Sequence, residues 1–281
     1  MTIDEAIRST AIRLQKAGIA NERREASSLM RFAIDRPAAF LIAHPEYVLT
    51  ADEQNALDGL VDKRSQRIPF QHLTRLQEFY GLEFEVSADV LIPRPETEIL
   101  VEKAVEILRP LDQPSFLELG LGSGCISISI LHEVPQASAV SVDLSPLALA
   151  VADSNARRHE VADRLALIES DLFAKVNGEF HMIVSNPPYI PDGDIASLQA
   201  EVRDFEPLLA LAGGSDGLDV IRRIIQNAAT YLKPGGWLLM EIGYGQSSAV
   251  RDELKKAEWR DISFLDDLQG IPRTALAQRP I

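Results

Sequence analysis

The fold is indicated most clearly by Phe116-Leu117-Glu118-Leu119-Gly120-Leu121-Gly122-Ser123-Gly124. It begins as a short apolar strand and runs into three glycines at alternate positions. Such a loop can turn tightly and lie against a ligand, because no Cβ intervenes. A strand that enters a glycine loop and then a helix is typical of nucleotide-binding α/β sheets. The segment therefore predicts a parallel sheet with a ligand at the carboxyl ends of its strands.

Predicted strands and helices alternate along the rest of the C-terminal part. We expect strands at 116–119, 139–142, 165–168, 182–185 and 237–242. Helices are expected to start near 124 and to span 146–159 and 218–232, the last ended by Lys233-Pro234-Gly235-Gly236. Short strands at 262–265 and 274–277 would form an antiparallel hairpin at the sheet edge. This pattern favours an α/β, Rossmann-like fold with helices on both faces of the sheet.

The N-terminal part has a helical pattern instead. Thr2-Ile3-Asp4-Glu5 and Thr50-Ala51-Asp52-Glu53 match capping boxes, and a further helix is expected at 22–34. Residues 77–86 have aromatic and β-branched residues around a central glycine, which is typical of a β-hairpin. A helix is expected from about residue 96 to 108. We therefore expect a small all-α domain at 1–68, a β-hairpin linker at 69–93 and the α/β domain at 94–281.

Charge is distributed unevenly between these parts. Of the net charge of −14, residues 1–70 contribute nothing, with ten basic and ten acidic residues, whereas the remainder has 18 basic and 32 acidic residues. Because binding to a polyanion depends on Lys and Arg contacts to phosphates, a nucleic acid is a poor candidate for the direct substrate.

No apolar run is long enough to span a membrane, and no signal peptide is evident. We expect a cytoplasmic monomer. A metal site is not expected, since Cys125 is the only cysteine and the histidines are scattered.

The glycine loop indicates which nucleotide would bind. Its glycines occupy the first, third and fifth positions, not the first, third and sixth of the dinucleotide fingerprint. Glu118 would repel a pyrophosphate, but it suits the cationic ammonium and sulfonium of S-adenosylmethionine. Asp143, about 20 residues further on, can accept both ribose hydroxyls. Asp171 can accept from the adenine amino group, with Leu172 beside the ring. The residues expected to bind this cofactor are Glu118, Gly120, Leu121, Gly122, Ser123, Gly124, Asp143, Leu144, Asp171, Leu172 and Asn186.

A second motif, Asn186-Pro187-Pro188-Tyr189, follows the strand expected at 182–185. Two prolines stiffen the turn, so its carbonyl groups can project into a pocket. The Asn186 side-chain oxygen and the Pro187 carbonyl can each accept one N–H of a substrate –NH2, and Tyr189 can stack on a planar group. We therefore expect methylation of an amide or amino nitrogen, with Asn186, Pro187 and Tyr189 as the catalytic residues and Pro188 also in contact with substrate.

The tetrapeptide alone leaves several functions open. An adenine-N6 methyltransferase presents the same –NH2 geometry, although base flipping would be expected to need a basic cleft. A ribosomal-protein glutamine methyltransferase would act on the same kind of side chain, and the sequence alone distinguishes it poorly from an enzyme that methylates glutamine in another protein. A non-catalytic S-adenosylmethionine-binding protein would predict a broken tetrapeptide, whereas this one is intact.

Several segments together resemble the protein release factor glutamine methyltransferases, the PrmC/HemK family, over nearly the whole chain. They are Pro69–Thr74, Phe79–Gly81, Leu91–Glu98, the glycine loop, Asn186–Ile190, Glu201-Val202, Glu206-Pro207, Ala210-Leu211 and Leu268–Arg273.

The resemblance implies the class I S-adenosylmethionine-dependent methyltransferase fold and N5-methylation of a glutamine in the Gly-Gly-Gln motif of peptide chain release factors. It also implies that the helical domain docks this protein substrate, and that Arg94 and Glu96 border the cofactor and the entering glutamine. Arg75, where the family often has glycine, and Leu172, often aromatic in relatives, depart from the pattern.

Overall fold

The structure, a computed structural model, describes residues 1–279, which divide into two compact units. The first comprises Met1–Arg75 and Gln199–Phe205, and the second comprises Leu76–Leu198 and Glu206 onwards. The chain therefore enters the first unit twice, once at its N-terminus and once as a short insertion that follows the Asn-Pro-Pro-Tyr motif. None of the helices in the described part of the chain is long and apolar enough to cross a membrane.

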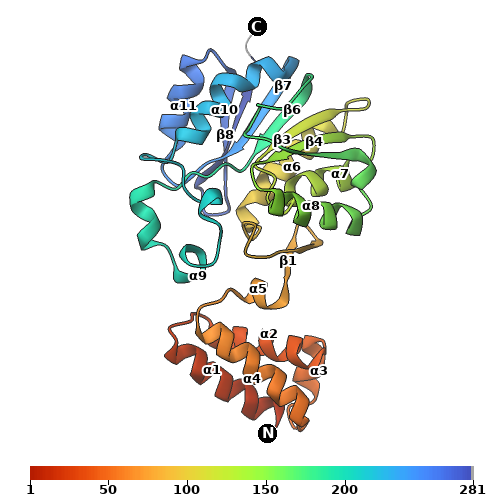
Figure 1. Cartoon of the computed structure of the whole chain (residues 1–281), viewed down its shortest axis with the longest axis vertical. Helices are drawn as coiled ribbons and strands as arrows, with labels where there is room; N and C mark the ends of the chain where they lie inside the picture. The colour runs from red at the N-terminus through yellow and green to blue at the C-terminus, as the bar shows by residue number, and fades with distance from the viewer. Residues whose placement is uncertain (280–281) are drawn as a thin grey trace. The chain divides into compact units, whose positions relative to one another are not determined.

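The first unit is entirely helical (Figure 1). Its helices are α1 (Ile3–Lys16), α2 (Glu22–Ile34), α3 (Ala38–Ala43), α4 (Ala51–Ser65), α5 (Phe70–Thr74) and α9 (Ala200–Arg203). Both expected capping boxes are present, because Thr2 and Thr50 accept from the backbone N–H three residues later and the glutamate there accepts in return. An apolar core that includes Leu14, Leu29 and Leu57 holds helices α1 to α5 together. Helices α3, α5 and α9 were not expected from the sequence, and α5 lies in the segment expected to be the β-hairpin linker.

The second unit begins with the expected hairpin. Strands β1 (Leu76–Phe79) and β2 (Leu82–Glu85) pair antiparallel. The connecting residues Tyr80 and Gly81 have φ values of +53° and +74°, the left-handed conformations that a two-residue hairpin turn requires. Helix α6 (Glu98–Leu108) follows, preceded by a 3-10 turn at Pro95–Thr97.

Seven strands form the main sheet in the order β5-β4-β3-β6-β7-β9-β8. The first five in this order are parallel: β5 (Leu165–Glu169), β4 (Ser138–Asp143), β3 (Ser115–Leu119), β6 (Phe180–Ser185) and β7 (Leu232–Glu241). The antiparallel hairpin of β8 (Arg260–Asp266) and β9 (Pro272–Gln278) completes the edge, with β9 paired to β7. The predicted fold class is therefore confirmed.

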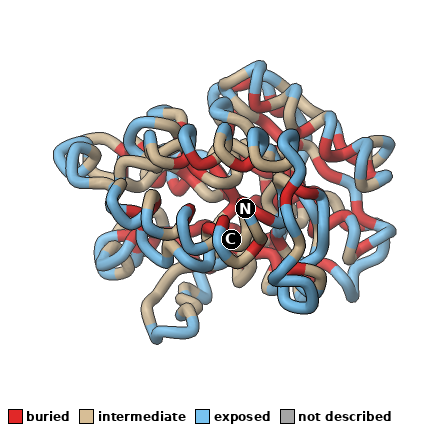
Figure 2. Tube along the Cα trace, turned by 90° about the horizontal axis from the view of Figure 1, so that it is seen from below, coloured by how far each residue is buried: buried red, intermediate tan, exposed pale blue. Residues whose placement is uncertain are grey.

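Helices cover both faces of this sheet (Figure 1). Helices α6, α7 (Cys125–Glu133) and α8 (Pro146–Arg158) lie on one face, and α10 (Asp219–Asn227) and α11 (Ser247–Lys256) lie on the other. Neighbouring residues of a strand point to opposite faces. Phe116 therefore packs in the apolar core shared with α6 and α7, and Leu117 packs in the core shared with α10 and α11. Buried residues gather inside the molecule, and exposed residues lie on the outer turns of the chain (Figure 2).

One sequence-based prediction needs correction. Lys233-Pro234-Gly235-Gly236 was expected to separate a helix from the following strand, but β7 runs through it from Leu232. The register jumps from Phe180↔Leu232 to Met182↔Trp237, so these residues form an irregular bulge within the strand. The preceding helix ends earlier than predicted, at Asn227, and continues as a 3-10 turn. Helix α11 was not predicted.

Candidate active site

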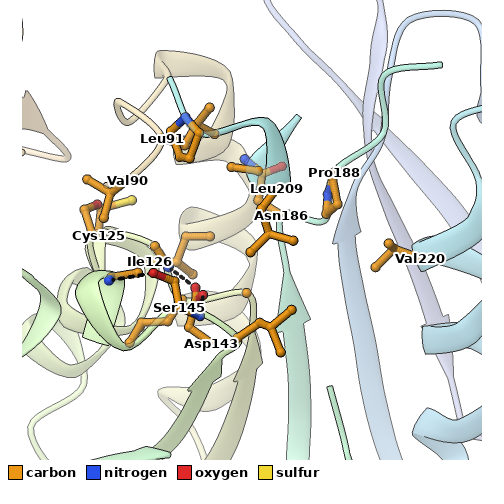
Figure 3. Close-up of a pocket in the computed structure, with 18 of the residues that line it drawn as sticks. Val90, Leu91, Cys125, Ile126, Asp143, Ser145, Asn186, Pro188, Leu209 and Val220 are labelled. Carbon is orange, nitrogen blue, oxygen red and sulfur yellow. Dashed lines mark hydrogen bonds between the residues drawn. The ribbon is translucent and has the colours of Figure 1, made fainter. Parts of the chain in front are cut away.

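A cavity of about 250 Å³ lies at the carboxyl ends of β3, β4, β5 and β6 (Figure 3). Each of these strands contributes the residues that follow it, as the sequence predicted for a ligand site. The expected residues that line it are Arg94, Gly120, Leu121, Gly122, Ser123, Asp143, Leu144, Asp171, Leu172, Asn186 and Pro188. Five other expected residues are not among the lining: Glu96, Glu118, Gly124, Pro187 and Tyr189.

The glycine loop is anchored to the neighbouring strand. The N–H groups of Gly120 and Leu121 donate to the Val142 carbonyl at 2.9 and 3.0 Å. Gly122 has a φ of +56°, and a Cβ placed there would meet no atom within 4 Å, so this glycine leaves open space on the cavity side. Gly124 has a φ of +82°, and a Cβ there would lie 2.9 Å from Ile128 Cδ1. Gly124 therefore serves close packing and not the cavity wall.

Asp143, at the end of β4, ties the loop to the next helix. Its Oδ2 accepts from the Gly122 N–H at 2.8 Å, and its Oδ1 accepts from the Ser145 N–H at 2.9 Å. A carboxylate has about four lone-pair positions, so each oxygen can still accept from a ligand hydroxyl. The residue is partly exposed and lines the cavity. Its geometry fits a ligand with two adjacent hydroxyl groups.

Asp171, after β5, has a partner that the sequence did not reveal. Arg223 Nη2 donates to Asp171 Oδ2 at 2.8 Å, and both residues line the cavity with about half of each side chain exposed. Leu172 beside them has a φ of +47°. Its carbonyl accepts from the Ser170 hydroxyl at 3.0 Å, which holds this turn in place. Arg223 comes from α10, 52 residues along the chain, and no motif marks it.

Glu118 is fully buried and lies away from the cavity surface. Its Oε2 accepts from the Ser127 N–H at 3.0 Å, whereas Oε1 has no hydrogen-bond partner among residues 1–279. Burial raises the pKa of Glu118 to about 8. A buried acceptor without a partner is costly unless a donor or cation reaches it. Glu118 does not line the cavity, so its predicted contact with a cationic ligand group stays a prediction.

The Asn-Pro-Pro-Tyr motif begins directly after β6. Asn186 Nδ2 donates to Thr97 Oγ1 at 3.3 Å, and the Tyr189 hydroxyl donates to Glu241 Oε1 at 3.2 Å. The Tyr189 hydroxyl is therefore engaged by Glu241 and does not point to a ligand. Burial, together with the nearby Glu241 carboxyl group, raises the pKa of Tyr189. Gln246 Nε2 donates to the Tyr189 carbonyl at 2.9 Å, which fixes the end of the motif.

Arg94 reaches the cavity from the segment before α6. It donates to Glu206, whose side chain is 1% exposed and also accepts from the Ile92 N–H at 3.4 Å. Burial raises the pKa of Glu206, and the Arg94 guanidinium opposes this shift. The ion pair positions Arg94 on the cavity wall, where it can contact a substrate or cofactor.

Elsewhere, the described residues include no group of three His, Cys, Asp or Glu side chains arranged to hold a metal ion. Cys125 lines the cavity, but burial raises the pKa of its thiol, which keeps it protonated and a poor nucleophile.

Two family models match the chain, the PrmC N-terminal domain over residues 5–74 and the methyltransferase small domain over residues 96–202. A release factor glutamine methyltransferase from Geobacter sulfurreducens is 41% identical over 97% of this chain and 95% of the relative. One from Koribacter versatilis is 39% identical over 100% of this chain and 99% of the relative. The solved structure of a methyltransferase from Pyrococcus furiosus is 14% identical, with a TM-score of 0.55 over 78% of this chain and 99% of that one, and shows the fold alone.

The glycine loop, the acidic strand ends and the sheet with its C-terminal antiparallel hairpin define a Rossmann-like methyltransferase of class I. Two relatives that are about 40% identical over nearly the full length identify a narrower family within this class. The chain belongs to the family of release factor glutamine methyltransferases.

Proposed function

We propose that this enzyme transfers a methyl group from S-adenosylmethionine to the side-chain amide nitrogen, N5, of the glutamine in the Gly-Gly-Gln motif of peptide chain release factors. The names of its relatives supply the substrate class. The observation that carries the chemistry is the orientation of Asn186. Its Nδ2 is engaged by Thr97, and within residues 1–279 no hydrogen bond occupies its Oδ1, so an acceptor remains on the cavity wall.

The residues around the cavity fit S-adenosylmethionine in three respects. Asp143 offers carboxylate acceptors for the ribose hydroxyls. Asp171, Leu172 and Leu144 provide one acceptor and two apolar side chains for the adenine. The unpartnered oxygen of Glu118 and the open space at Gly122 suit the cationic methionine portion. The bound cofactor would supply an electrophilic methyl group on a sulfonium.

The protein's own contribution is to orient a weak nucleophile. An amide nitrogen is a poor nucleophile because its lone pair is delocalised into the carbonyl. Asn186 Oδ1 and the Pro187 carbonyl would each accept one N–H of the glutamine amide, which directs the remaining lone pair at the methyl group. Holding the nitrogen and the methyl group in line is a large source of rate. The proton lost from nitrogen would leave to solvent after transfer, and no side-chain base is required.

We also propose that the helical unit docks the protein substrate. This unit has its own core and leaves several large apolar side chains exposed, with Ile42 82% and Val48 64% exposed. Exposed apolar side chains of this kind are suited to a protein partner. We expect no nucleic-acid substrate, because the α/β part is acidic, and we expect the enzyme to act as a cytoplasmic monomer.

The test incubates the full chain and labelled S-adenosylmethionine with a purified release factor, a ribosomal protein or a DNA duplex. We expect label only in the release factor, at the Gly-Gly-Gln glutamine, located by peptide mass spectrometry. Asn186→Ala is expected to lower the rate at least about a hundredfold. Label in either other substrate alone, or an unaffected Asn186→Ala variant, would contradict the proposal.

A further inference from the structure

Glu241 is a buried carboxylate, 2% exposed, on the last residue of β7. Its Oε2 accepts from Thr97 Oγ1 at 2.5 Å, and its Oε1 accepts from the Tyr189 hydroxyl at 3.2 Å. Thr97 in turn accepts from Asn186 Nδ2. Glu241 is not among the expected site residues, yet its carboxylate connects to both ends of the Asn-Pro-Pro-Tyr motif.

We propose that Glu241 is a positioning residue that fixes which end of the Asn186 amide faces the substrate. It acts through Thr97 and does not touch the substrate itself. This inference rests on the proposed function, because it explains how Asn186 would present an acceptor to a substrate –NH2.

The inference follows from the directions of the hydrogen bonds. Both oxygens of Glu241 accept from hydroxyl groups, one from Thr97 and one from Tyr189, so the single hydroxyl proton of Thr97 lies in the hydrogen bond to Glu241. The Thr97 oxygen can then only accept from Asn186, which turns Nδ2 towards Thr97. The opposite end of the amide, Oδ1, is thereby left for the cavity. Through Thr97, the Glu241 side chain therefore determines the orientation of the Asn186 amide.

Without this constraint, Asn186 has two orientations of nearly the same shape. A Thr97 hydroxyl that is free to rotate can donate to Oδ1 of a flipped amide. The flipped amide would present its own N–H groups to the N–H groups of the substrate. Two donors that face each other repel, so the flipped form would not hold the glutamine for transfer.

Tyr189 gives an independent second connection. Its hydroxyl donates to the other oxygen of Glu241, so the carboxylate fixes the first and the last residue of the motif together. The motif also has stiff proline residues between these two points. A small displacement of Glu241 would therefore be transmitted to the whole tetrapeptide.

The experiment compares Glu241→Gln, Thr97→Val and Thr97→Ser in the full-length enzyme, with the release factor as substrate. A matched control is Thr274→Val, because Thr274 is fully buried, lies opposite Glu241 in the sheet register, and its hydroxyl makes no hydrogen bond among the described residues. We expect kcat to fall about 10- to 100-fold in Glu241→Gln and Thr97→Val, because misorientation of a reacting group has effects of this size. The Kd for S-adenosylmethionine, measured by calorimetry, should stay within about twofold.

Thr97→Ser retains the hydroxyl and should restore kcat to within about threefold of wild type. Thr274→Val should match wild type. A purely structural role for Thr97 and Glu241 would instead lower thermal stability and cofactor affinity along with kcat. Wild-type kcat in both Glu241→Gln and Thr97→Val would overturn the inference.

A second measurement separates this inference from the proposed function. Side-chain amide protons of Asn186 can be followed by NMR in the same proteins. We expect their shifts and exchange protection to be shared by wild type, Thr97→Ser and Thr274→Val, and lost in Thr97→Val and Glu241→Gln. Unchanged signals in those two variants would overturn the inference whatever the activity. Failure of the wild type to label a release factor would contradict the proposed function alone.

Discussion

Arg64 and Glu201 are 137 positions apart in the sequence, yet Arg64 Nη2 donates to Glu201 Oε1 at 3.0 Å. Arg64 is buried, with a side chain 5% exposed, and also donates to Glu25 at 2.6 Å. Arg67 donates to the other oxygen of Glu201 at 2.7 Å. The insertion Gln199–Phe205 is therefore held in the helical unit by a network of charges.

Replacement of Arg64 by methionine should destabilise the helical unit. The variant leaves Glu25 without its arginine partner and Glu201 with Arg67 alone, and loss of one partner from a buried pair costs about 3 kcal/mol. Urea unfolding measures this change. Arg8→Met is the matched control, because Arg8 and its partner Asp4 are exposed, and it should cost less than about 0.5 kcal/mol. Equal effects of the two variants would contradict the role of the network.

Replacement of Asp143 by asparagine should weaken cofactor binding. The side chain would then offer one oxygen and one NH2 group to two backbone donors, Gly122 and Ser145, so one donor loses its acceptor. We expect the Kd for S-adenosylmethionine to rise at least about tenfold, equivalent to roughly 1.4 kcal/mol. Calorimetry provides the measurement. Asp153→Asn, at an exposed site on α8, should leave the Kd unchanged.

Alanine at Gly122 and alanine at Gly124 should have different consequences. Both glycines have positive φ, but only at Gly124 would a methyl group meet close neighbours, Ile128 and Ala152. Gly124→Ala should therefore lose about 2 to 4 kcal/mol of folding free energy. Gly122→Ala should lose about 1 kcal/mol and mainly reduce cofactor affinity, because its methyl group would occupy open space at the cavity. Denaturation and cofactor titration distinguish the two variants. A larger stability loss in Gly122→Ala and a larger affinity loss in Gly124→Ala would contradict the roles given to these two glycines.

The raised pKa of Glu118 predicts a pH dependence of stability. Its pKa is about 8 in the folded state, against 4.5 for an ordinary glutamate. Between these values the folded chain holds a proton that the unfolded chain releases, so stability falls as pH rises, by up to roughly 1.4 kcal/mol per pH unit, and levels off above pH 8. Glu118→Gln lacks this contribution. The difference in unfolding free energy between wild type and variant should therefore shift between pH 5 and pH 8, and a constant difference would rule out the proton on Glu118.

A charge at Ile42 tests the proposed docking role of the helical unit. Because Ile42 is 82% exposed, Ile42→Asp should leave the melting temperature within about 2 °C of wild type. If the release factor contacts this residue, KM for that substrate should rise at least about fivefold at unchanged kcat, the pattern for loss of uniform binding. Steady-state kinetics with varied release factor measures the effect. An unchanged KM would place the docking surface elsewhere.

Local patterns in the sequence predicted most of the fold. Capping boxes placed the start of α1 and α4, and the alternation of apolar strands with helices gave the parallel sheet and its edge hairpin. These features depend on neighbouring residues, which is why the sequence is sufficient. The Lys233–Gly236 segment is the exception, because Leu232 and Trp237 on either side of it both pair with β6, so these turn-forming residues become an irregular bulge within β7.

The residues of the candidate site also fall into two groups, those that local sequence predicts and those that it does not. The glycine loop, the acids at the strand ends and the Asn-Pro-Pro-Tyr motif could be predicted from local sequence, because a parallel sheet brings all its carboxyl ends to one edge. The partners of these groups depend on tertiary packing: Arg223 for Asp171, and Glu241 through Thr97 for Asn186. Thr97 and Glu241 are 144 residues apart. Their contact depends on the packing of complete elements, which no local pattern in the chain encodes.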